Sequence, residues 1–407
     1  MYLLERIISR SGRENTGICY VNHMLRESAF REEEMVRRVA RERGIYYCIV
    51  RARVRELARD RGWSIEEAGR KIRYRILERV ASRRGFDYIA TGHNLNDAFE
   101  TFIMNSIRGS GVMGLIIPPR RGKIIRPLIL MEKEKILKYL EKHGIPFSMD
   151  ETNLQDDFSR NFIRNQVEAK ILERFPHALR GFRRTYMNLV GEYRFTLRNL
   201  KSLFRRSLLF RRRRFYIFDA DILLLEDKHL VSTLFSRMVP NITQEHIRSI
   251  MEILSSGGKV NVPGNVFFHS QYGFLSIYRN PPEVYGTFFL YPGSGLLHLS
   301  DIARIKYRIS REPVKGPHFM SIPLGKVSFP LRIRKRRAGD RIGRKKLKDA
   351  FVDSKIPAFL RDAIPVVESM GEVIFVPGVF KKQFHPFRDS AYLVIETGGF
   401  VRRFMRK

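Results

Sequence analysis

Short apolar runs alternate with amphipathic segments from Thr16 to about Pro146. Runs of strand length stand at residues 17–21, 46–50 and 88–90, and a further one stands near 124–125. The segments between them have the apolar spacing of helices, which is the pattern of βαβ units on a parallel sheet. The sequence therefore predicts an α/β domain at the start of the chain.

The segment from Ser64 to Gly85 carries the strongest helix signals. Glu67 follows Ser64 by three residues, as in a capping box, and Gly85 is a typical residue just past a helix end. Apolar residues at intervals of three and four predict a buried stripe, made of Ile65, Ala68, Ile72, Ile76 and Val80. Arg70 and Arg73 lie off this stripe, one turn apart.

We expect two further domains, with boundaries near residues 165 and 283. Residues 1–165 form the α/β domain, and residues 166–283 read as a mostly helical, basic domain, with helix to about residue 225 and mixed structure beyond. Turns near 255–258 and 262–265 bound a hairpin. Pro281 and Pro282 break the chain, and residues 284–407 read as a small α+β domain.

The chain is a folded polycation. Its 76 Lys and Arg residues exceed 42 Asp and Glu residues, which gives a formal charge of +34, and 43% of the residues are hydrophobic, as in a globular protein. The electrostatic field of such an excess of positive charge concentrates polyanions near the protein. It favours nucleic acid as the partner, because each phosphate that the protein neutralises releases counterions. Charge alone does not exclude an anionic membrane surface as the partner.

Composition also excludes several classes of protein. Cys19 and Cys48 are each alone in their segment, which excludes a disulfide framework, a four-cysteine zinc site and a C-x-x-C redox pair, and is typical of a reducing cytoplasm. No apolar run reaches the ~18 residues of a spanning helix, and the N-terminus lacks the pattern of a signal peptide. The sequence therefore argues against secretion and membrane insertion.

Two predicted strands end in segments that suit a ligand. In open α/β sheets ligands lie beyond the carboxyl ends of the strands, where Val21, Asn22 and His23 follow one strand and residues 91–93 follow another. Backbone groups and an imidazole at this position can bind a nucleotide base. A histidine at a strand end is, however, more often a local hydrogen-bonding residue.

The segment from Thr91 to Thr101 has two interpretations. Gly92 permits close approach of a ligand, the helix start after Asn94 presents free N–H groups, and Asp97 suits Mg²⁺ on a triphosphate. Alternatively, Asn94 caps the helix and Asp97 favours its first turn. Residues Phe99, Phe102, Ile103 and Ile107 are expected to face the core.

Candidate RNA contacts fall in three segments. Arg160 and Arg164 are one helical turn apart, shortly after the polar stretch 150–153, and suit a phosphate clamp. The runs 201–214 and 332–348 carry seven and ten basic residues. These runs favour surfaces that bind along the nucleic-acid backbone. The alternative for each run is a solvated protein surface with no partner. Within them the candidates are Arg205, Arg206, Arg334, Lys335, Arg336, Arg341, Lys345 and Lys346.

Taken in order, the motifs resemble the tRNA(Ile)-lysidine synthase family of the ATP-pyrophosphatase, or N-type PP-loop, superfamily. Residues 21–26 match V-N-H-x-L-R, 66–74 match E-E-A-x-R-x-x-R-Y, and 91–101 match T-x-H-x-x-D-D-Q-x-E-T. Further similarity lies at 108–111, 118–121, 125–128, 150–153, 160–164, 260–264, 334–341 and 345–349. The resemblance spans nearly the whole chain.

The resemblance implies a two-step reaction at the wobble cytidine of the isoleucine tRNA with a CAU anticodon. The C2 oxygen attacks the α-phosphate of ATP, and the ε-amine of free L-lysine then displaces AMP. Asp97, Arg70 and Arg73 are the expected stabilising groups, with Mg²⁺ at Asp97. Asp97 or His93 is expected to deprotonate lysine. Val21, Asn22, His23 and Gly92 are the expected ATP contacts.

Two departures from the family pattern stand out. The chain lacks the Ser-Gly-Gly-x-Asp-Ser loop that cradles phosphates, and it begins with residues 1–8, which resemble the helix after that loop. We therefore expect a true start roughly 25–30 residues upstream, and a 407-residue chain that binds tRNA but forms no AMP. Asn96 and Ala98 stand where Asp and Gln are expected.

Two alternatives remain at this point. A non-catalytic tRNA-binding remnant fits the changes at Asn96 and Ala98. A PP-loop tRNA thiolase fits the N-terminal half, but such enzymes use cysteine pairs, and Cys19 and Cys48 are not spaced for one. The sequence is compatible with a monomer or a homodimer.

Overall fold

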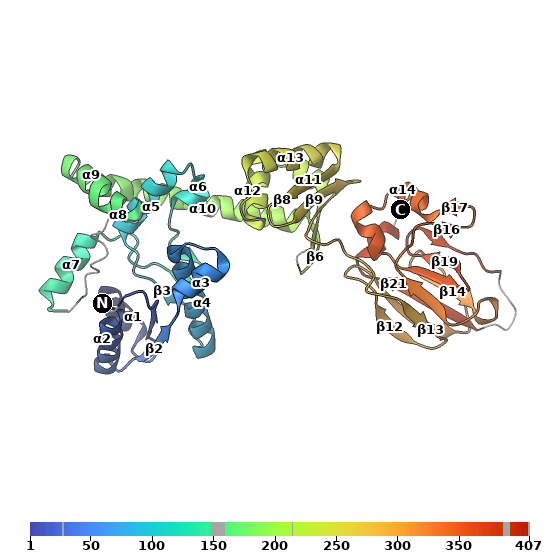
Figure 1. Ribbon diagram of the computed structural model, residues 1–407, viewed down its shortest axis with the longest axis horizontal. Helices are drawn as coiled ribbons and strands as arrows, with labels where there is room; N and C mark the ends of the chain where they lie inside the picture. Colours follow the sequence, from blue (N-terminus) through green and yellow to red (C-terminus); the bar gives the residue numbers. More distant parts are fainter. Residues whose placement is uncertain (27, 146, 148–158, 214, 386–390, 406–407) are drawn as a thin grey trace. The chain divides into compact units, whose positions relative to one another are not determined.

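The computed structural model describes residues 1–26, 28–145, 147, 159–213, 215–385 and 391–405 (Figure 1). It divides into two compact units, Met1–Phe195 and Thr196–Lys407. The 30-residue helix α10 (Ala178–Ser207) begins in the first unit and ends in the second. The expected motif at 150–153 lies outside the described residues, and the expected domain limits at 165 and 283 remain predictions. No helix in the described part of the chain is long and apolar enough to cross a membrane.

The first unit contains the expected α/β domain. Strand β1 (Gly17–Asn22) pairs in parallel with β2 (Tyr46–Arg51), with Gly17 opposite Tyr46. Strand β3 (Ile89–Ala90) pairs in parallel with β5 (Ile124–Ile125), and β4 (Arg120–Arg121) pairs antiparallel with β5. The predicted strands are therefore confirmed.

The strands of this unit form two separate sheets rather than one. A cavity of about 1320 Å³ is lined by both, through Gly17–Tyr20 of β1 and Ile89 and Ala90 of β3, and by helix α1 (Tyr2–Ser11). The additional strand expected upstream of the first residue remains a prediction.

Helices connect and cover these strands. They are α2 (Ser28–Arg43), α3 (Val54–Arg61), α4 (Ile65–Arg84), α5 (Leu95–Ile107), α6 (Val112–Leu115) and α7 (Lys133–Lys142). Then follow α8 (Ser159–Phe162), the π-helix η2 (Ile163–Glu168) and α9 (Ala169–Arg174). The caps of α4 are as predicted, because the Glu67 amide donates to Ser64 Oγ and Gly85 has a positive φ. Its C-cap therefore uses the left-handed conformation that glycine tolerates.

Two residues expected in the core are exposed instead. Ile65 is 45% exposed and Ile107 is 74% exposed. Ile65 is the first residue of α4 and Ile107 is the last residue of α5, so each extends past the surface that buries the middle of its helix. Periodicity alone does not indicate where that covering surface stops.

The second unit begins with an antiparallel sheet packed on helices. The strand order is β6-β7-β10-β9-β8. The strands are β6 (Leu208–Arg212), β7 (Phe215–Asp219), β8 (Gly258–Val262), β9 (Val266–Gln271) and β10 (Phe274–Tyr278), and the helices are α11 (Ala220–Leu225), α12 (Lys228–Met238) and α13 (Gln244–Ser256). The hairpin expected near 255–265 is confirmed as β8–β9. The helix expected up to residue 225 is wrong from Leu208 to Asp219, where β6 and β7 pair instead.

The last part of the chain, expected to be an α+β domain, consists mainly of β-strands with a few short helical pieces. One sheet has the order β11-β15-β18-β19-β20, a second has the order β12-β13-β21-β14, and β16 pairs with β17. The strands are β11 (Phe288–Leu290), β12 (Gly295–His298), β13 (Arg304–Ser310), β14 (Phe319–Pro323), β15 (Leu331–Arg334), β16 (Arg341–Ile342), β17 (Lys345–Lys346), β18 (Val366–Ser369), β19 (Glu372–Val376), β20 (Phe380–Lys381) and β21 (Tyr392–Gly398). Helical pieces are η3 (Leu324–Lys326), α14 (Leu347–Asp353), η4 (Ala358–Ala363) and η5 (Phe400–Met405). Ile305, Ile333 and Leu393 belong to the core that the two larger sheets share.

Candidate functional site

Helix α5 begins with a capping box that places Asp97. Asn94 Oδ1 accepts a hydrogen bond from the Asp97 amide at 3.1 Å, and Asp97 Oδ2 accepts one from the Asn94 amide at 2.9 Å. The capping interpretation of this segment is therefore confirmed. It does not exclude a functional role, because the same hydrogen bonds fix the Asp97 carboxylate at the carboxyl end of β3.

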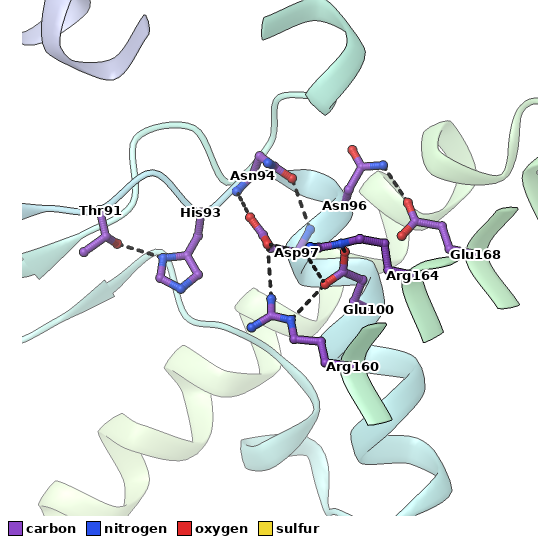
Figure 2. A network of polar contacts seen from close by, with 9 residues as sticks. All are labelled: Thr91, His93, Asn94, Asn96, Asp97, Glu100, Arg160, Arg164 and Glu168. Atoms are coloured by element: carbon purple, nitrogen blue, oxygen red, sulfur yellow. Dashed lines mark hydrogen bonds and ion pairs between the residues drawn. The ribbon is translucent and has the colours of Figure 1, made fainter. Parts of the chain in front are cut away.

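Two arginines bind the acidic face of α5 (Figure 2). Arg160 donates to Asp97 Oδ1 at 3.1 Å and to Glu100 Oε2 at 2.9 Å. Arg164 donates to both Glu100 oxygens, at 2.6 and 3.1 Å, and its Nη2 lies 3.6 Å from Asp97 Oδ1. The Glu100 side chain is only 2% exposed. We call Asp97, Glu100, Arg160 and Arg164 the α5 ion network.

This network changes the interpretation of its arginines. A buried carboxylate costs several kcal/mol of solvation unless it is paired and hydrogen-bonded. Arg160 and Arg164 supply those partners to Glu100, so ion pairing with α5 accounts for their placement, and their expected contact with RNA remains a prediction. Sequence reasoning did not select Glu100, although it stands three residues after Asp97, the spacing that places two side chains on one helix face.

His93 stands beside this network as a neutral imidazole. Its Nδ1 lies 2.9 Å from Thr91 Oγ1. Burial, and then the positive charges of Arg126, Arg160, Arg70 and Arg73, together lower the pKa of His93 to about 4. Near pH 7 the ring is therefore unprotonated and can accept a hydrogen bond or a proton.

A pocket of about 280 Å³ joins most of the predicted catalytic residues. It is lined by Arg73, Tyr74, Thr91, Gly92, His93, Asp97 and Arg160. A Cβ at Gly92 would meet no atom within 4 Å, so the backbone there borders open space. Arg70 is outside the lining, and its guanidinium lies 5.3 Å from the Tyr74 ring centroid.

His23 connects the end of β1 to α4. Arg73 donates to its Nε2 from Nη2 at 3.0 Å and from Nε at 3.3 Å. Burial, then Arg73 and Arg26, lower the pKa of His23 to about 4. Its Nδ1 is buried and has no hydrogen-bond partner within the described part of the chain.

The other predicted ATP contacts at this strand end serve the fold. The Asn22 amide group donates to Glu33 Oε1 at 2.7 Å, and its Oδ1 accepts from the Met24 amide at 2.8 Å. Val21 and Asn22 are both buried. Any contact of these two residues with a nucleotide would therefore use backbone groups, which remains a prediction.

Asn96, one residue before Asp97, joins three elements. Its Nδ2 donates to Glu168 Oε1 at 2.6 Å, and its Oδ1 accepts from the Lys133 amide at 2.9 Å. Burial is the largest cause that raises the pKa of Glu168 to about 7; Glu100 raises it too, and the Asn96 hydrogen bond opposes the rise. Neither Asn96 contact was foreseen from the sequence.

A magnesium ion does not fit Asp97 as the structure places it. One carboxylate oxygen accepts from the Asn94 amide and the other from Arg160, and a second guanidinium lies nearby. The described residues contain no group of three His, Cys, Asp or Glu side chains that would hold a metal. Mg²⁺ prefers several free oxygen ligands and waters.

The predicted RNA contacts of the second unit differ in availability. Arg334 is buried, with Nε 2.7 Å from Glu368 Oε2 and its terminal nitrogens 2.8 and 2.9 Å from the Asp340 oxygens. Lys335 pairs with Glu283 and Asp362, Arg336 with Asp362, Lys345 with Asp353 and Arg206 with Glu226. Arg205, Arg341 and Lys346 are exposed. The geometry therefore disfavours the RNA-contact interpretation for Arg334.

The two cysteines are neighbours across strands. Cys19 of β1 lies opposite Cys48 of β2. Burial, and then the nearby Cys48, raise the pKa of the Cys19 thiol to about 12, so it carries no thiolate at neutral pH. The sequence spacing did not indicate this proximity, and the raised pKa disfavours a sulfur-transfer role.

Known proteins are similar to this chain in two separate regions and also over most of its length. The family described as PP-loop domain matches residues 1–171, and the TilS substrate C-terminal domain matches residues 331–396. A tRNA(Ile)-lysidine synthase of Pseudothermotoga lettingae is 29% identical over 385 residues, covering 92% of this chain and 82% of the relative. One from Thermotoga maritima is 28% identical, covering 94% and 89%. A crystal structure of a TILS C-terminal domain is 31% identical, with TM-score 0.26, over 28% of this chain and 97% of that one.

Proposed function

The chain belongs to the tRNA(Ile)-lysidine synthase family, and on that premise we propose that it is an ATP-dependent ligase that joins L-lysine to C2 of the wobble cytidine of the CAU-anticodon isoleucine tRNA. The C2 oxygen attacks the α-phosphate of ATP, which releases pyrophosphate. The lysine ε-amine then attacks C2, and AMP leaves with the C2 oxygen. The pocket between His93, Asp97, Arg73 and Arg160 carries the proposal.

We assign the lysine-facing role to His93 rather than to Asp97. The ε-amine must be unprotonated when it attacks, and a neutral imidazole at the pocket wall can accept a hydrogen bond from it and hold it in place. Asp97 is already engaged by the Asn94 amide and by Arg160. Its part is to orient Arg160 at the pocket and to keep local charge balanced.

Arg73 and Arg160 supply positive charge at the pocket. Adenylation develops negative charge on phosphate oxygens, which guanidinium groups stabilise through hydrogen bonds in a site shielded from water. Arg70 adds to the local field without lining the pocket. Mg²⁺ enters this proposal only as the ion that accompanies ATP, and we assign it no protein ligand.

The tRNA contacts are proposed for exposed cations of the second unit. Arg337, Arg341, Arg344, Lys346 and Lys348 are exposed and surround the β16–β17 hairpin. Arg205, near the end of α10, is exposed as well. Such cations suit the phosphate backbone, which fixes orientation without reading sequence.

The direct test is lysine incorporation. Purified protein is incubated with ATP, labelled L-lysine and a CAU-anticodon isoleucine tRNA transcript, and label in the tRNA is counted. Label that depends on ATP and is lost in His93→Gln supports the proposal, and it overturns the expectation that the 407-residue chain forms no AMP. A transcript with the wobble cytidine replaced by uridine is the matched control. Label in both transcripts, or tRNA binding with no label under any condition, contradicts it.

A further inference from the structure

Asn96 ties the helix that carries Asp97 to the segment that carries the two arginines. It lies in the first turn of α5, and its side chain donates to Glu168 at the end of η2 and accepts from the first amide of α7. One amide group therefore fixes α5, η2 and α7 together. Figure 2 shows the Asn96–Glu168 contact on the far side of the α5 ion network from His93.

The segment from Arg160 to Glu168 is consequently held at both ends. Arg160 and Arg164 bind Asp97 and Glu100, and Glu168 binds Asn96 four residues further on. Residues 163–168 form a π-helix, a rare conformation often found at functional sites. Attachment at two places sets both the distance of this segment from α5 and its rotation, so it sets where the Arg160 guanidinium meets the pocket.

In the structure, position 96 supplies the hydrogen-bond donor of the pair. Glu168 is 4% exposed, and its Oε2 has no hydrogen-bond partner within the described part of the chain. A carboxylate at position 96 would face the Glu168 carboxylate across 2.6 Å with little water to screen it. The amide instead donates a hydrogen bond to Glu168, so Asn96 matches its neighbour where the family pattern has an acidic residue.

We propose that Asn96 and Glu168 act as a pair of positioning residues that seats Arg160 and Arg164 on α5, and that Asn96 is a matched replacement rather than a lost metal ligand. The inference rests on the proposed function, because it concerns the geometry of that pocket. Neither residue lines the pocket, so neither is assigned a contact with substrate.

A reversed pair tests the inference. Four full-length proteins are compared: wild type, Asn96→Asp, Glu168→Gln, and the double variant, in which the amide and the carboxylate exchange places and a donor again faces an acceptor. We expect Asn96→Asp to lower kcat for lysine incorporation about 10-fold at unchanged KM for tRNA, and the double variant to recover to within about 3-fold of wild type. A kcat loss without a KM change separates positioning from weakened tRNA binding.

Several outcomes would overturn the pairing. Asn96→Asp with activity equal to or above wild type would mean that position 96 prefers a carboxylate. A double variant no better than Asn96→Asp would remove the coupling. An unfolding midpoint lowered with kcat per folded molecule unchanged would leave a structural role only.

A failure of the proposed function can be distinguished from a failure of the Asn96–Glu168 pairing. If the wild type incorporates no lysine, thermal unfolding of the same four proteins decides the pairing. A midpoint that falls by a few degrees in Asn96→Asp and returns in the double variant supports it, and additive single effects overturn it.

Discussion

Two arginine–carboxylate networks among the described residues differ in what surrounds them. In the first unit, Arg160 and Arg164 reach Asp97 and Glu100 from a segment more than sixty residues away along the chain, and Asp97 and Arg160 line a pocket. In the second unit, Arg334 at the end of β15 binds Asp340 in the loop that follows this strand and Glu368 on β18. We call these three residues the β15 ion network.

The difference separates the cluster at the proposed site from a structural one. Arg334 and Glu368 are both 6% exposed at the side chain, whereas Asp97 is 19% and Arg160 is 28% exposed. The β15 network is therefore closed to ligands, and it shapes the loop that leads to the exposed cations. The α5 network keeps one side open. Partial exposure next to a pocket, rather than ion pairing itself, indicates the site.

Breaking the β15 network should give the largest effect, on stability. Arg334→Ala leaves Glu368 and Asp340 buried without their partner, and we expect a loss of about 3–5 kcal/mol in the free energy of unfolding of the second unit. Urea denaturation followed by circular dichroism measures it. The single tryptophan, Trp63, lies in the first unit, so its fluorescence transition should not move. Arg337→Ala, exposed in the same run, is the control, and an equal loss there contradicts the prediction.

Breaking the α5 network should affect activity more than stability. Glu100→Gln removes the charge that holds Arg160 and Arg164, and we expect lysine incorporation to fall about 100-fold, or about 2.7 kcal/mol. Trp63 fluorescence during urea denaturation reports the accompanying loss of stability, which we expect to be smaller. Glu134→Gln, at an exposed pair with Lys138 on α7, should match wild type. If Glu100→Gln unfolds at lower urea concentration but keeps its activity, the α5 ion network is structural, like the β15 ion network.

The histidine of the pocket gives a pH-dependent effect. Burial holds the pKa of His93 near 4 in the folded chain, below its ordinary value of 6.5. The unfolded chain therefore binds a proton that the folded one does not as pH falls below 6.5, and stability is lost from pH 6.5 towards pH 4. Over this pH range the free energy of unfolding of His93→Gln should fall by about 1–2 kcal/mol less than that of the wild type. Trp63 fluorescence during urea denaturation at pH 7 and pH 5 checks this, and parallel losses in both proteins would refute it.

Charge reversal at the surface should have the smallest effect per residue. Arg341→Glu and Lys346→Glu change exposed cations, and each should weaken tRNA binding and flatten its salt dependence by about one unit of slope. Lys335→Glu is the comparison, because that side chain already pairs with Glu283 and Asp362. Filter binding at several salt concentrations measures both. Equal slopes for all variants would mean that the hairpin is only solvated surface.

Local signals could be read from the sequence, and long-range partners could not. Ser64 and Gly85 marked the ends of α4, and Asn94 marked the start of α5, because caps depend on residues within one turn. The pairing of Arg160 with Glu100 depends on how the chain folds back over sixty residues, which no local spacing encodes. The sequence predicts helix throughout the basic run at 201–214, whereas residues 208–212 of this run form the strand β6.

The motifs identified the family but not the state of each side chain. His93, Asp97 and Arg73 do line one pocket, as their order along the chain suggested. Arg334 looked like its exposed neighbours, since strand alternation and basic composition do not reveal a buried carboxylate on β18. The sequence indicates at Asn96 only the loss of an acidic side chain, because the hydrogen bond to Glu168 depends on the tertiary structure.

The capping box of α5 makes the assembly of the pocket observable without substrate. The amide of Asp97 is hydrogen-bonded to Asn94 Oδ1, while the carboxylate of the same residue holds Arg160. Fraying of this first turn would release the amide to solvent and misplace the carboxylate at the same moment. Hydrogen–deuterium exchange at that one amide therefore reports how often the pocket comes apart.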